Sequence, residues 1–438
     1  MNHTATAAAA AASYEAGPAR APRTPVRRAL RIAFGGLAAL LVTIAATAAA
    51  FLGTALLVPV PTATTLAAAA VLLGVAVATA RWPLRPGRAR LAWAAAVSAA
   101  VTAASWPLFQ PLAPATAQAA ADGSAHEHWT LPTGSRIAYR RFAAEPGAAP
   151  RATPVVYLHG GPAVPARQTI VESLQPLRAA GYDLVVYDQV GSGASGRLDD
   201  IAGYTLERNV ADLEAIREQL GAQQLVLVGS SWGAVLATHY LAAHPERVQR
   251  MVLLAPGVLT RRTDFPYDHR RSASAEDDRV LLPPPRMVLA GVLARISPPA
   301  AERFASQDEM GAEMDRFIAS GALEAQGRCA GSPAPAATAG RAAGANYYAN
   351  LMIKRSLERA PDPRERLREV HTPVLILRGE CDYIPLASAQ LYRDALPAAR
   401  LAEVPGAGHA LTAGAAGEAV AAAMRTFLEE PAPAPAMR

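Results

Sequence analysis

The stretch Leu225-Val226-Leu227-Val228-Gly229-Ser230-Ser231-Trp232-Gly233 decides the fold that we predict for this chain. Its four consecutive aliphatic residues are typical of a strand buried on both faces of a sheet, and a helical pattern follows at 234–243. The motif G-x-S-x-G between them puts a serine in a strained strand-to-helix turn, where only small neighbours leave room for the backbone. Ser231 is therefore the predicted nucleophile, and the alternative is an ordinary strand-to-helix loop.

Short runs of aliphatic and β-branched residues recur on both sides of this turn. They lie at 136–142, 154–158, 183–187, 224–228, 250–254 and 373–377. Apolar residues at helical spacing separate them, most clearly at 205–220. Strands that alternate with helices predict an α/β domain with a doubly wound, mostly parallel sheet.

A serine hydroxyl needs a base beside it at neutral pH, and that base needs an acid to orient it. In the chain order that accompanies G-x-S-x-G, the acid follows the serine and the histidine comes last. Asp382 follows the 373–377 run, and His409 lies in a glycine-flanked loop after 400–404. Asp382 is the predicted acid and His409 the predicted base. Glu380 is the competing acid, but it is nearer the strand end, so we expect it to be held away from the imidazole.

Acyl transfer also needs donors aimed at the developing oxyanion. The sequence His159-Gly160-Gly161-Pro162 follows the strand predicted at 155–158, and glycines let backbone N–H groups approach a substrate closely. The backbone N–H groups of Gly161 and Trp232 are the predicted oxyanion hole. A plain glycine-rich turn is the alternative for this loop.

The alternation of strands and helices lapses over 257–360, where helical patterns appear at 300–318 and 346–359. Because this region lies between two strands of the sheet, we predict a largely helical cap over the carboxyl ends of the strands. The predicted core consists of 126–256 and 361–430, and the Ala/Pro-rich end, 431–438, is predicted to be a disordered tail.

The N-terminal part of the chain is markedly apolar. No charged residue occurs from Ile32 to Ala80, which is far more than the roughly 20 residues that span a bilayer as a helix. Pro59 and Pro61 divide this stretch. We predict a membrane region, 32–109, with transmembrane helices near 34–58, 64–80 and 91–109.

Arginines set the predicted orientation of these spans, because short cytoplasmic flanks are rich in basic residues. They place a basic tail, 1–31, in the cytoplasm, and the domain that follows a tether at 110–125 outside it. Interfacial or buried helices are the alternative for one or two spans. The third apolar run also resembles a signal peptide with a small-residue cleavage site at Ala117-Gln118-Ala119.

The net charge of +6 belongs to this N-terminal part. Residues 1–90 hold nine arginines and one acid, Glu15, so they carry +8, and the remaining residues carry −2. A domain that is nearly neutral lacks the basic surface of a nucleic-acid-binding protein. We therefore predict no nucleic-acid partner, and a lipid bilayer as the partner of the N-terminal region.

Three motifs of the C-terminal part resemble those of a known family. The sequences at 159–162, 188–195 (Asp-Gln-Val-Gly-Ser-Gly-Ala-Ser) and 229–233 are similar to the HGGP, DQxGxGxS and GxSWG motifs of prolyl aminopeptidases (proline iminopeptidases) and related α/β-hydrolases. The resemblance covers roughly 127–430, with the cap poorly matched. It implies an α/β-hydrolase fold with a helical cap, and a Ser-His-Asp enzyme without metal or other cofactor that removes N-terminal residues, often proline, from small peptides.

Departures from the family pattern limit this expectation. Ala163 and Val190 stand where the family has glycine and arginine, and Gly344 stands where a cap glutamate should bind the free amine of the peptide. A buried ammonium without a carboxylate is costly, so a peptidase needs another acid. The acids at hand lie on a predicted helix face, which is more often solvated, so we nominate none of them: Asp308, Glu309, Glu313 and Asp315. The alternatives are a carboxylesterase or similar hydrolase, and a non-catalytic membrane binding protein with this fold.

Cys329, in the predicted cap, and Cys381, beside Asp382, are the two cysteines of the chain. Outside the cytoplasm they are free to form a disulfide that ties the cap to the loop of the acid. Two unpaired buried thiols are the alternative, because sequence cannot show how far apart they lie.

Overall fold

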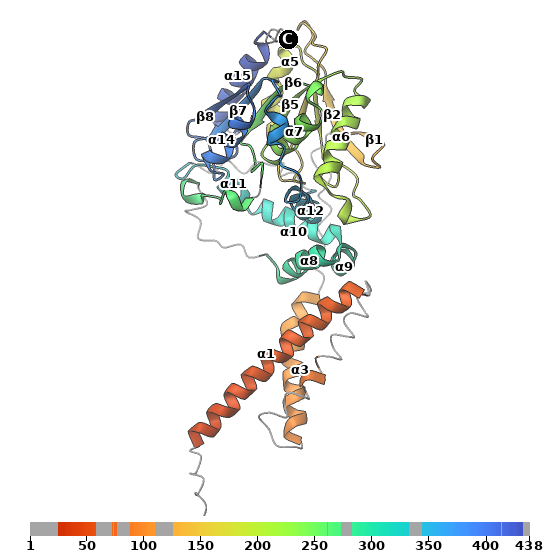
Figure 1. The fold of residues 1–438 in the computed structure, drawn as a ribbon, viewed down its shortest axis with the longest axis vertical. Helices are drawn as coiled ribbons and strands as arrows, with labels where there is room; N and C mark the ends of the chain where they lie inside the picture. The colour runs from red at the N-terminus through yellow and green to blue at the C-terminus, as the bar shows by residue number, and fades with distance from the viewer. Residues whose placement is uncertain are drawn as a thin grey trace, which may run out of the picture. The chain divides into compact units, whose positions relative to one another are not determined.

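The structure, a computed structural model, describes residues 25–57, 72, 74–76, 88–109, 126–260, 262–272, 283–332, 344–412 and 414–431. These residues form two compact units (Figure 1), one holding most of α1 and α3 and the other holding everything from residue 126 onward. The predicted tether, most of the predicted span 64–80 and all but the first residue of the predicted tail lie outside the described residues.

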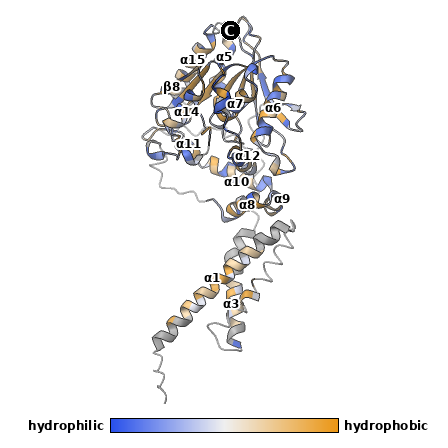
Figure 2. Ribbon diagram, in the orientation of Figure 1, coloured by the Kyte–Doolittle hydropathy of each residue, from blue (hydrophilic) through white to orange (hydrophobic). Residues whose placement is uncertain are grey.

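Among its described residues, the first unit contains the long helices α1 (Pro25–Leu57) and α3 (Arg88–Phe109). Ala76, Ala94 and Val97 form a small apolar cluster in it, with Trp93 packed alongside. Along α1, large apolar side chains are exposed, and Figure 2 shows pale to orange hydropathy over the coloured parts of α1 and over those of α3 apart from one blue end.

The predicted spans 34–58 and 91–109 coincide with α1 and α3, except for residue 58, which is not described. Within the described part of the chain, no helix combines the length and the apolar character that crossing a membrane requires. The membrane region therefore stays a prediction.

The second unit is built on one sheet whose strands include each of the runs predicted from the sequence. Its strands are β1 (Glu127–Thr130), β2 (Arg136–Phe142), β3 (Val155–Leu158), β4 (Leu184–Tyr187), β5 (Leu225–Ser230), β6 (Val248–Leu254), β7 (Val374–Gly379) and β8 (Ala399–Val404). The spatial order is β1-β2-β4-β3-β5-β6-β7-β8. The pairs β1/β2 and β2/β4 are antiparallel and all others are parallel, which confirms the mostly parallel sheet.

Helices cover both faces of this sheet, because its central strands are apolar on both sides. On one face α15 (Gly414–Glu429) contacts α4 (Gln168–Leu174) and α5 (Pro176–Ala179). On the other, α7 (Trp232–Ala243) contacts α6 (Leu206–Gln219) and α13 (Arg364–Leu367), and α13 contacts α14 (Leu386–Ala395). Short 3-10 helices lie at Ile201–Gly203, Pro245–Arg247, Arg262–Asp264 and His269–Arg271. The parallel strands thus end at one common edge, where their loops meet.

Between β6 and β7, the described residues of the predicted cap, 257–360, form five α-helices. They are α8 (Pro285–Ile296), α9 (Pro298–Phe304), α10 (Gln307–Ala319), α11 (Ala322–Gln326) and α12 (Tyr347–Leu357). The single helix predicted at 300–318 is divided, because α9 ends at Phe304 and Ser306 is the N-cap residue of α10. Its hydroxyl accepts the backbone N–H of Glu309 at 3.1 Å, which caps the first turn of α10.

Candidate active site

The turn between β5 and α7 has the geometry of a nucleophile elbow. Ser231 has φ 53° and ψ −114°, a strained conformation for a residue with a side chain. Both flanking glycines are sterically required: a Cβ on Gly229 would lie 2.4 Å from the carbonyl oxygen of Gly233, and one on Gly233 would lie 1.9 Å from that of Leu158. The turn therefore holds the Ser231 hydroxyl at the carboxyl edge of the sheet.

The three side chains predicted as nucleophile, base and acid lie in one hydrogen-bonded chain. The Oγ of Ser231 is 2.9 Å from Nε2 of His409, and Nδ1 of His409 is 2.9 Å from Oδ1 of Asp382. Because an ionised carboxylate can only accept, Nδ1 donates to it and Nε2 is left to accept the serine proton. The Asp382 side chain is 1% exposed and that of His409 is 14% exposed. Water therefore hardly reaches the acid, while one face of the base stays accessible.

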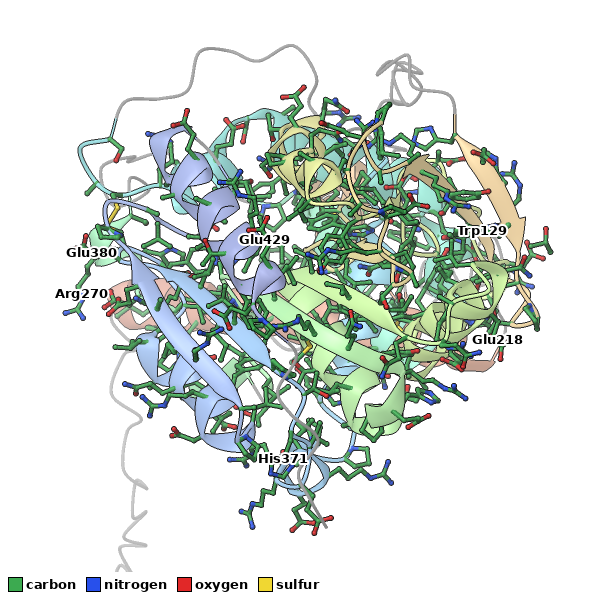
Figure 3. The ribbon with its side chains drawn as sticks, turned by 90° about the horizontal axis from the view of Figure 1, so that it is seen from above. Trp129, Glu218, Arg270, His371, Glu380 and Glu429 are labelled. Carbon is green, nitrogen blue, oxygen red and sulfur yellow. A yellow bond between two sulfur atoms is a disulfide. The ribbon has the colours of Figure 1, made fainter. Side chains whose placement is uncertain are left out.

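The competing acid, Glu380, has a different partner. Its carboxylate accepts the backbone N–H of Gly406 at 3.1 Å, in the loop that leads from β8 to His409. Figure 3 shows Glu380 at the edge of the domain, close to the disulfide described below. The imidazole thus meets Asp382, whose Oδ1 also accepts the N–H of Ile384 at 2.9 Å.

Glycines also bring the histidine loop close to its neighbours. A Cβ on Gly379 would lie 2.1 Å from the carbonyl oxygen of Gly408, and a Cβ on Gly408 would lie 2.4 Å from that of Gly327. Gly408, which precedes His409, therefore has a packing reason, because a side chain there would collide with the cap and displace the loop of the imidazole.

The loop after β3 passes directly beside the nucleophile. A Cβ on Gly160 would lie 3.2 Å from Cβ of Ser231 and 3.8 Å from its Oγ. Within the described part of the chain, the N–H groups of Gly161 and Trp232 donate to no backbone acceptor. This arrangement leaves both predicted oxyanion donors available to a substrate.

Gln189 joins the nucleophile turn to this loop, a role that the sequence did not reveal. Its side-chain oxygen accepts the indole N–H of Trp232 at 2.9 Å, and its side-chain NH₂ donates to the carbonyl of His159 at 2.9 Å. Its backbone N–H donates to Nε2 of His159, also at 2.9 Å. Burial lowers the pKa of His159 below its usual value, so the ring stays neutral and can accept this bond.

The motif that contains Gln189 folds upon itself. The Asp188 carboxylate accepts the N–H of Ala194 at 2.9 Å, and a Cβ on Gly193 would lie only 2.0 Å from that carboxylate. The Ser195 hydroxyl donates to the Asp188 carbonyl at 2.5 Å. These contacts explain the Asp, Gly and Ser of the motif as supports that hold Gln189 in place.

Aromatic rings lie beside the base. The ring centroid of Tyr383 is 4.6 Å from that of His409, and Tyr267 meets Tyr383 edge-on at 5.0 Å. Burial raises the pKa of Tyr383 above its usual value, so its phenol stays protonated. Sequence reasoning missed these rings because Tyr267 lies more than a hundred residues from Tyr383 along the chain.

Gly344, at the position where the resemblance implies a glutamate, has no space for a side chain. Its φ is +100°, and a Cβ would lie 2.9 Å from the Cα of Gly193. The absence of a carboxylate here is therefore built into the packing between the cap and the 188–195 loop, which the Gly193 N–H also joins to the Gly344 carbonyl at 2.9 Å.

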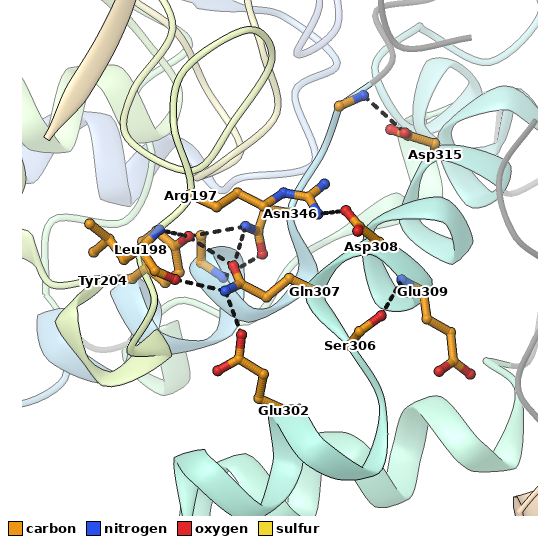
Figure 4. Close-up of polar contacts among 12 residues, drawn as sticks. Arg197, Leu198, Tyr204, Glu302, Ser306, Gln307, Asp308, Glu309, Asp315 and Asn346 are labelled. Atoms are coloured by element: carbon orange, nitrogen blue, oxygen red, sulfur yellow. Dashed lines mark hydrogen bonds and ion pairs between the residues drawn. The ribbon is translucent and has the colours of Figure 1, made fainter. Parts of the chain in front are cut away.

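Each of these four acids already has a protein partner, and Figure 4 draws the contacts of Asp308 and Asp315. Asp308 pairs with Arg197, Glu309 with Arg286 and Glu313 with Arg316. Asp315 accepts the backbone N–H groups of Gly344 and Ala345, both at 2.9 Å, and burial raises its pKa. These carboxylates thus stabilise the cap and its contact with the core.

The two cysteines form a disulfide between the cap and the loop of the acid. The Cα atoms of Cys329 and Cys381 are 5.2 Å apart, and both residues are buried. Two residues earlier in the cap, the carbonyl of Gly327 accepts the N–H of Ala410 at 2.9 Å. One short cap segment, 327–329, is therefore bonded to the acid loop and to the base loop.

Reducing this disulfide is expected to lower the free energy of unfolding by about 4 kcal/mol, because it releases a large loop in the unfolded chain. The cysteines are 52 residues apart in sequence. Denaturant melts with and without a phosphine reductant measure the change. A variant with both Cys329→Ser and Cys381→Ser should have the denaturation midpoint of the reduced protein, with or without reductant. Equal midpoints for oxidised and reduced wild type would contradict the expectation.

Comparison with known proteins places this geometry in a family. Residues 153–412 match the family described as alpha/beta hydrolase fold, which is more than half of the chain. The chain belongs to the alpha/beta hydrolase fold family. The matched residues include strands β3 to β8, the elbow and the helical insertion described above.

Part of the chain is also similar to curated proteins named proline iminopeptidase. Over 127 residues the alpha/beta hydrolase is 41% identical to a proline iminopeptidase of Lactobacillus delbrueckii subsp. bulgaricus, covering 28% of this chain and 41% of the relative. Over 126 residues it is 34% identical to a proline iminopeptidase of Heyndrickxia coagulans, covering 28% and 41%. The matched region thus spans about two fifths of the length of these relatives.

Among solved structures, the alpha/beta hydrolase is similar to a proline iminopeptidase from Mycobacterium smegmatis, with a TM-score of 0.45 and 19% identity over 69% of this chain and 97% of that one. It is also similar to an esterase from Exiguobacterium antarcticum, with a TM-score of 0.49 and 18% identity over 70% and 100%.

Proposed function

We propose that this chain is a membrane-anchored serine hydrolase that acts through an acyl-enzyme at Ser231. The observation that carries this proposal is the unbroken chain from Ser231 Oγ through His409 to Asp382, with both links at 2.9 Å. The Gly161 and Trp232 N–H groups beside the nucleophile support it.

In this mechanism, Ser231 Oγ bonds to the carbonyl carbon of the substrate as His409 Nε2 takes its proton. The carbonyl oxygen becomes an oxyanion that accepts from Gly161 and Trp232. Collapse of this intermediate breaks the bond to the leaving amine or alcohol, which receives the proton from His409. Water then attacks the acyl-enzyme by the same route and releases the acid, while Asp382 stabilises the imidazolium in both halves.

The substrate that we propose is a small peptide whose N-terminal residue, often proline, is released. The three motifs at 159–162, 188–195 and 229–233 and the likeness to relatives named proline iminopeptidase support this specificity. The likeness spans only about two fifths of those relatives, so the substrate rests chiefly on the motifs.

A carboxylesterase or similar hydrolase is the second candidate, and a specific observation favours it. The free amine of a peptide needs a carboxylate, yet Gly344 has no space for one, and three of the four nearby acids are paired with arginines. An uncharged ester needs no such partner.

One panel of substrates separates these candidates. Aminoacyl-naphthylamides, with proline among them, test the peptidase, and p-nitrophenyl esters test the esterase. Turnover of amides with proline preferred supports the peptidase, and ester turnover without amide turnover removes it. A fluorophosphonate probe that labels a known hydrolase in parallel should also label this protein. If the probe fails to label the folded protein, a non-catalytic binding protein becomes the better explanation.

We also propose that the N-terminal region spans the membrane and that the hydrolase domain lies outside the cytoplasm. The arginines at 20–31 and 81–90, separated by an uncharged stretch, support this orientation. Alkaline phosphatase fused to the C-terminus should be active. An inactive phosphatase fusion together with an active cytoplasmic reporter fusion would contradict the topology.

A further inference from the structure

The loop that carries Gly161 has an unusual backbone. Gly161 has φ +119° and Ala163, which has a side chain, has φ +58°. Glycine moves freely among many conformations, and a residue such as Ala163 stays at positive φ only where its surroundings hold it there. The direction of the Gly161 N–H is therefore not set by the loop alone, and contacts on both sides of Gly161 must set it.

The core anchors the loop on one side of Gly161. The carbonyl of His159 accepts from the side chain of Gln189 at 2.9 Å, and Gly160 packs against Ser231. These contacts end before the peptide units that follow Gly161. Something else must hold Pro162 and Ala163.

The cap supplies the contacts on the other side. The side-chain NH₂ of Asn350, in the first turn of α12, donates to the carbonyl of Pro162 at 2.7 Å. The backbone N–H of Asn346, the N-cap residue of α12, donates to the carbonyl of Ala163 at 3.1 Å. The peptide units that follow Pro162 and Ala163 are therefore bonded to the start of a cap helix.

This end of α12 is itself held firmly. The side-chain oxygen of Asn346 accepts the N–H of Ala349 at 3.0 Å, and its NH₂ donates to Gln307 at 3.1 Å. Gln307 in turn accepts from the hydroxyl of Tyr204 at 2.9 Å (Figure 4). Asn346, Gln307 and Tyr204 are all buried. The network therefore joins α12 to the core and fixes the position of the helix turn that carries Asn350.

We propose that Asn350 is a positioning residue for the oxyanion hole: by holding the carbonyl of Pro162, it keeps the Gly161 N–H aimed at the oxyanion. The inference rests on the proposed serine hydrolase mechanism. Under it the cap does more than cover the site, because one of its helices completes the donor pair. Asn350 touches no reacting atom and acts through the loop.

The test compares two substitutions on the same helix. Asn350→Leu keeps the approximate volume and removes the donor. The control, Tyr348→Phe, also removes one donor from α12, but the Tyr348 hydroxyl donates within the cap, to the carbonyls of Ala301 and Ala305 at 3.0 and 2.7 Å. Both variants lose a hydrogen bond of the cap, and only the first loses a contact with the loop of Gly161.

We expect Asn350→Leu to lower kcat by about 10- to 100-fold with KM within about threefold, because oxyanion donors act mainly in the transition state. The affinity for an aryl boronic acid, whose serine adduct places an oxygen in the oxyanion hole, should fall by a similar factor. Tyr348→Phe should keep kcat and boronate affinity within about threefold while lowering Tm. Asn350→Gln, which retains a donor, should recover part of the lost kcat.

Several outcomes would overturn this role for Asn350. They are a kcat for Asn350→Leu within threefold of wild type, a rise in KM alone, or an equal loss of kcat in Tyr348→Phe. Should Asn350→Leu fail to fold, Asn350→Asp replaces it, since an acceptor facing the Pro162 carbonyl should lower kcat at least as much. Wild-type protein that neither labels with the fluorophosphonate nor turns over any substrate overturns the proposed function, and this inference with it.

Discussion

Replacing Ser231 with alanine is expected to lower kcat by about 10⁴-fold or more and to abolish labelling by a fluorophosphonate. The reason is that the acyl-enzyme cannot form without Oγ, which in this structure lies 2.9 Å from Nε2 of His409. What activity remains would come from substrate binding and the oxyanion donors alone. Steady-state kinetics on the best substrate of the panel, together with labelling of the folded protein, measure both effects.

Ser230→Ala is the matched control, because Ser230 precedes the nucleophile in the same turn. Its loss should change kcat by no more than about threefold and leave labelling intact. Labelling that survives in Ser231→Ala and disappears in Ser230→Ala would contradict the assignment of the nucleophile. Equal circular dichroism spectra for both variants are needed to exclude a loss of fold.

Replacing Asp382 with asparagine is expected to lower kcat by about 10⁴-fold while the protein keeps its fold. The carboxylate now accepts from Nδ1 of His409 at 2.9 Å, which leaves Nε2 free to take the serine proton. An amide NH₂ facing Nδ1 would favour the opposite tautomer, in which Nε2 carries a proton and cannot act as the base. The loss should appear in kcat at every pH from 6 to 9.

Glu380→Gln is the control for this second prediction. Glu380 is the other carboxylate of the same loop, and it accepts the Gly406 N–H at 3.1 Å, which an amide oxygen can also do. We expect kcat within about threefold of wild type. If Glu380→Gln lost as much activity as Asp382→Asn, or Asp382→Asn lost little, Glu380 would be the better candidate for the acid.

The alternation of apolar runs with helical patterns was enough to predict the central strands, because the runs of β3, β4 and β5 are buried on both faces. The sequence analysis missed β1, which is mostly exposed. Helix ends were harder to predict. The break between α9 and α10 depends on Ser306, whose hydroxyl accepts the Glu309 N–H and caps the first turn of α10. The prediction of one helix at 300–318 did not take this cap into account.

In the candidate site, too, some residues could be predicted from the sequence and others could not. Ser231, Asp382 and His409 each follow a strand in the expected order, and the carboxyl ends of parallel strands meet at one edge, so their proximity could be predicted. The position of Glu380 near the strand end already argued against it as the acid, and its contact with Gly406 shows which group its carboxylate binds instead. Gln189 and Asn350 lacked any local signal of their partners, because they act through contacts with segments distant in sequence.

The sequence by itself determined the order of strands and helices, the elbow at 229–233 and the identity of the three candidate catalytic residues. These depend on local patterns: burial period, small residues around a strained turn, and chain order. Only the tertiary structure decided that Cys329 and Cys381 are joined, that Gly344 has no space for a side chain, and that α12 holds the loop of Gly161. Each of these is a contact between segments far apart in the chain, and such contacts depend on how the cap packs onto the core.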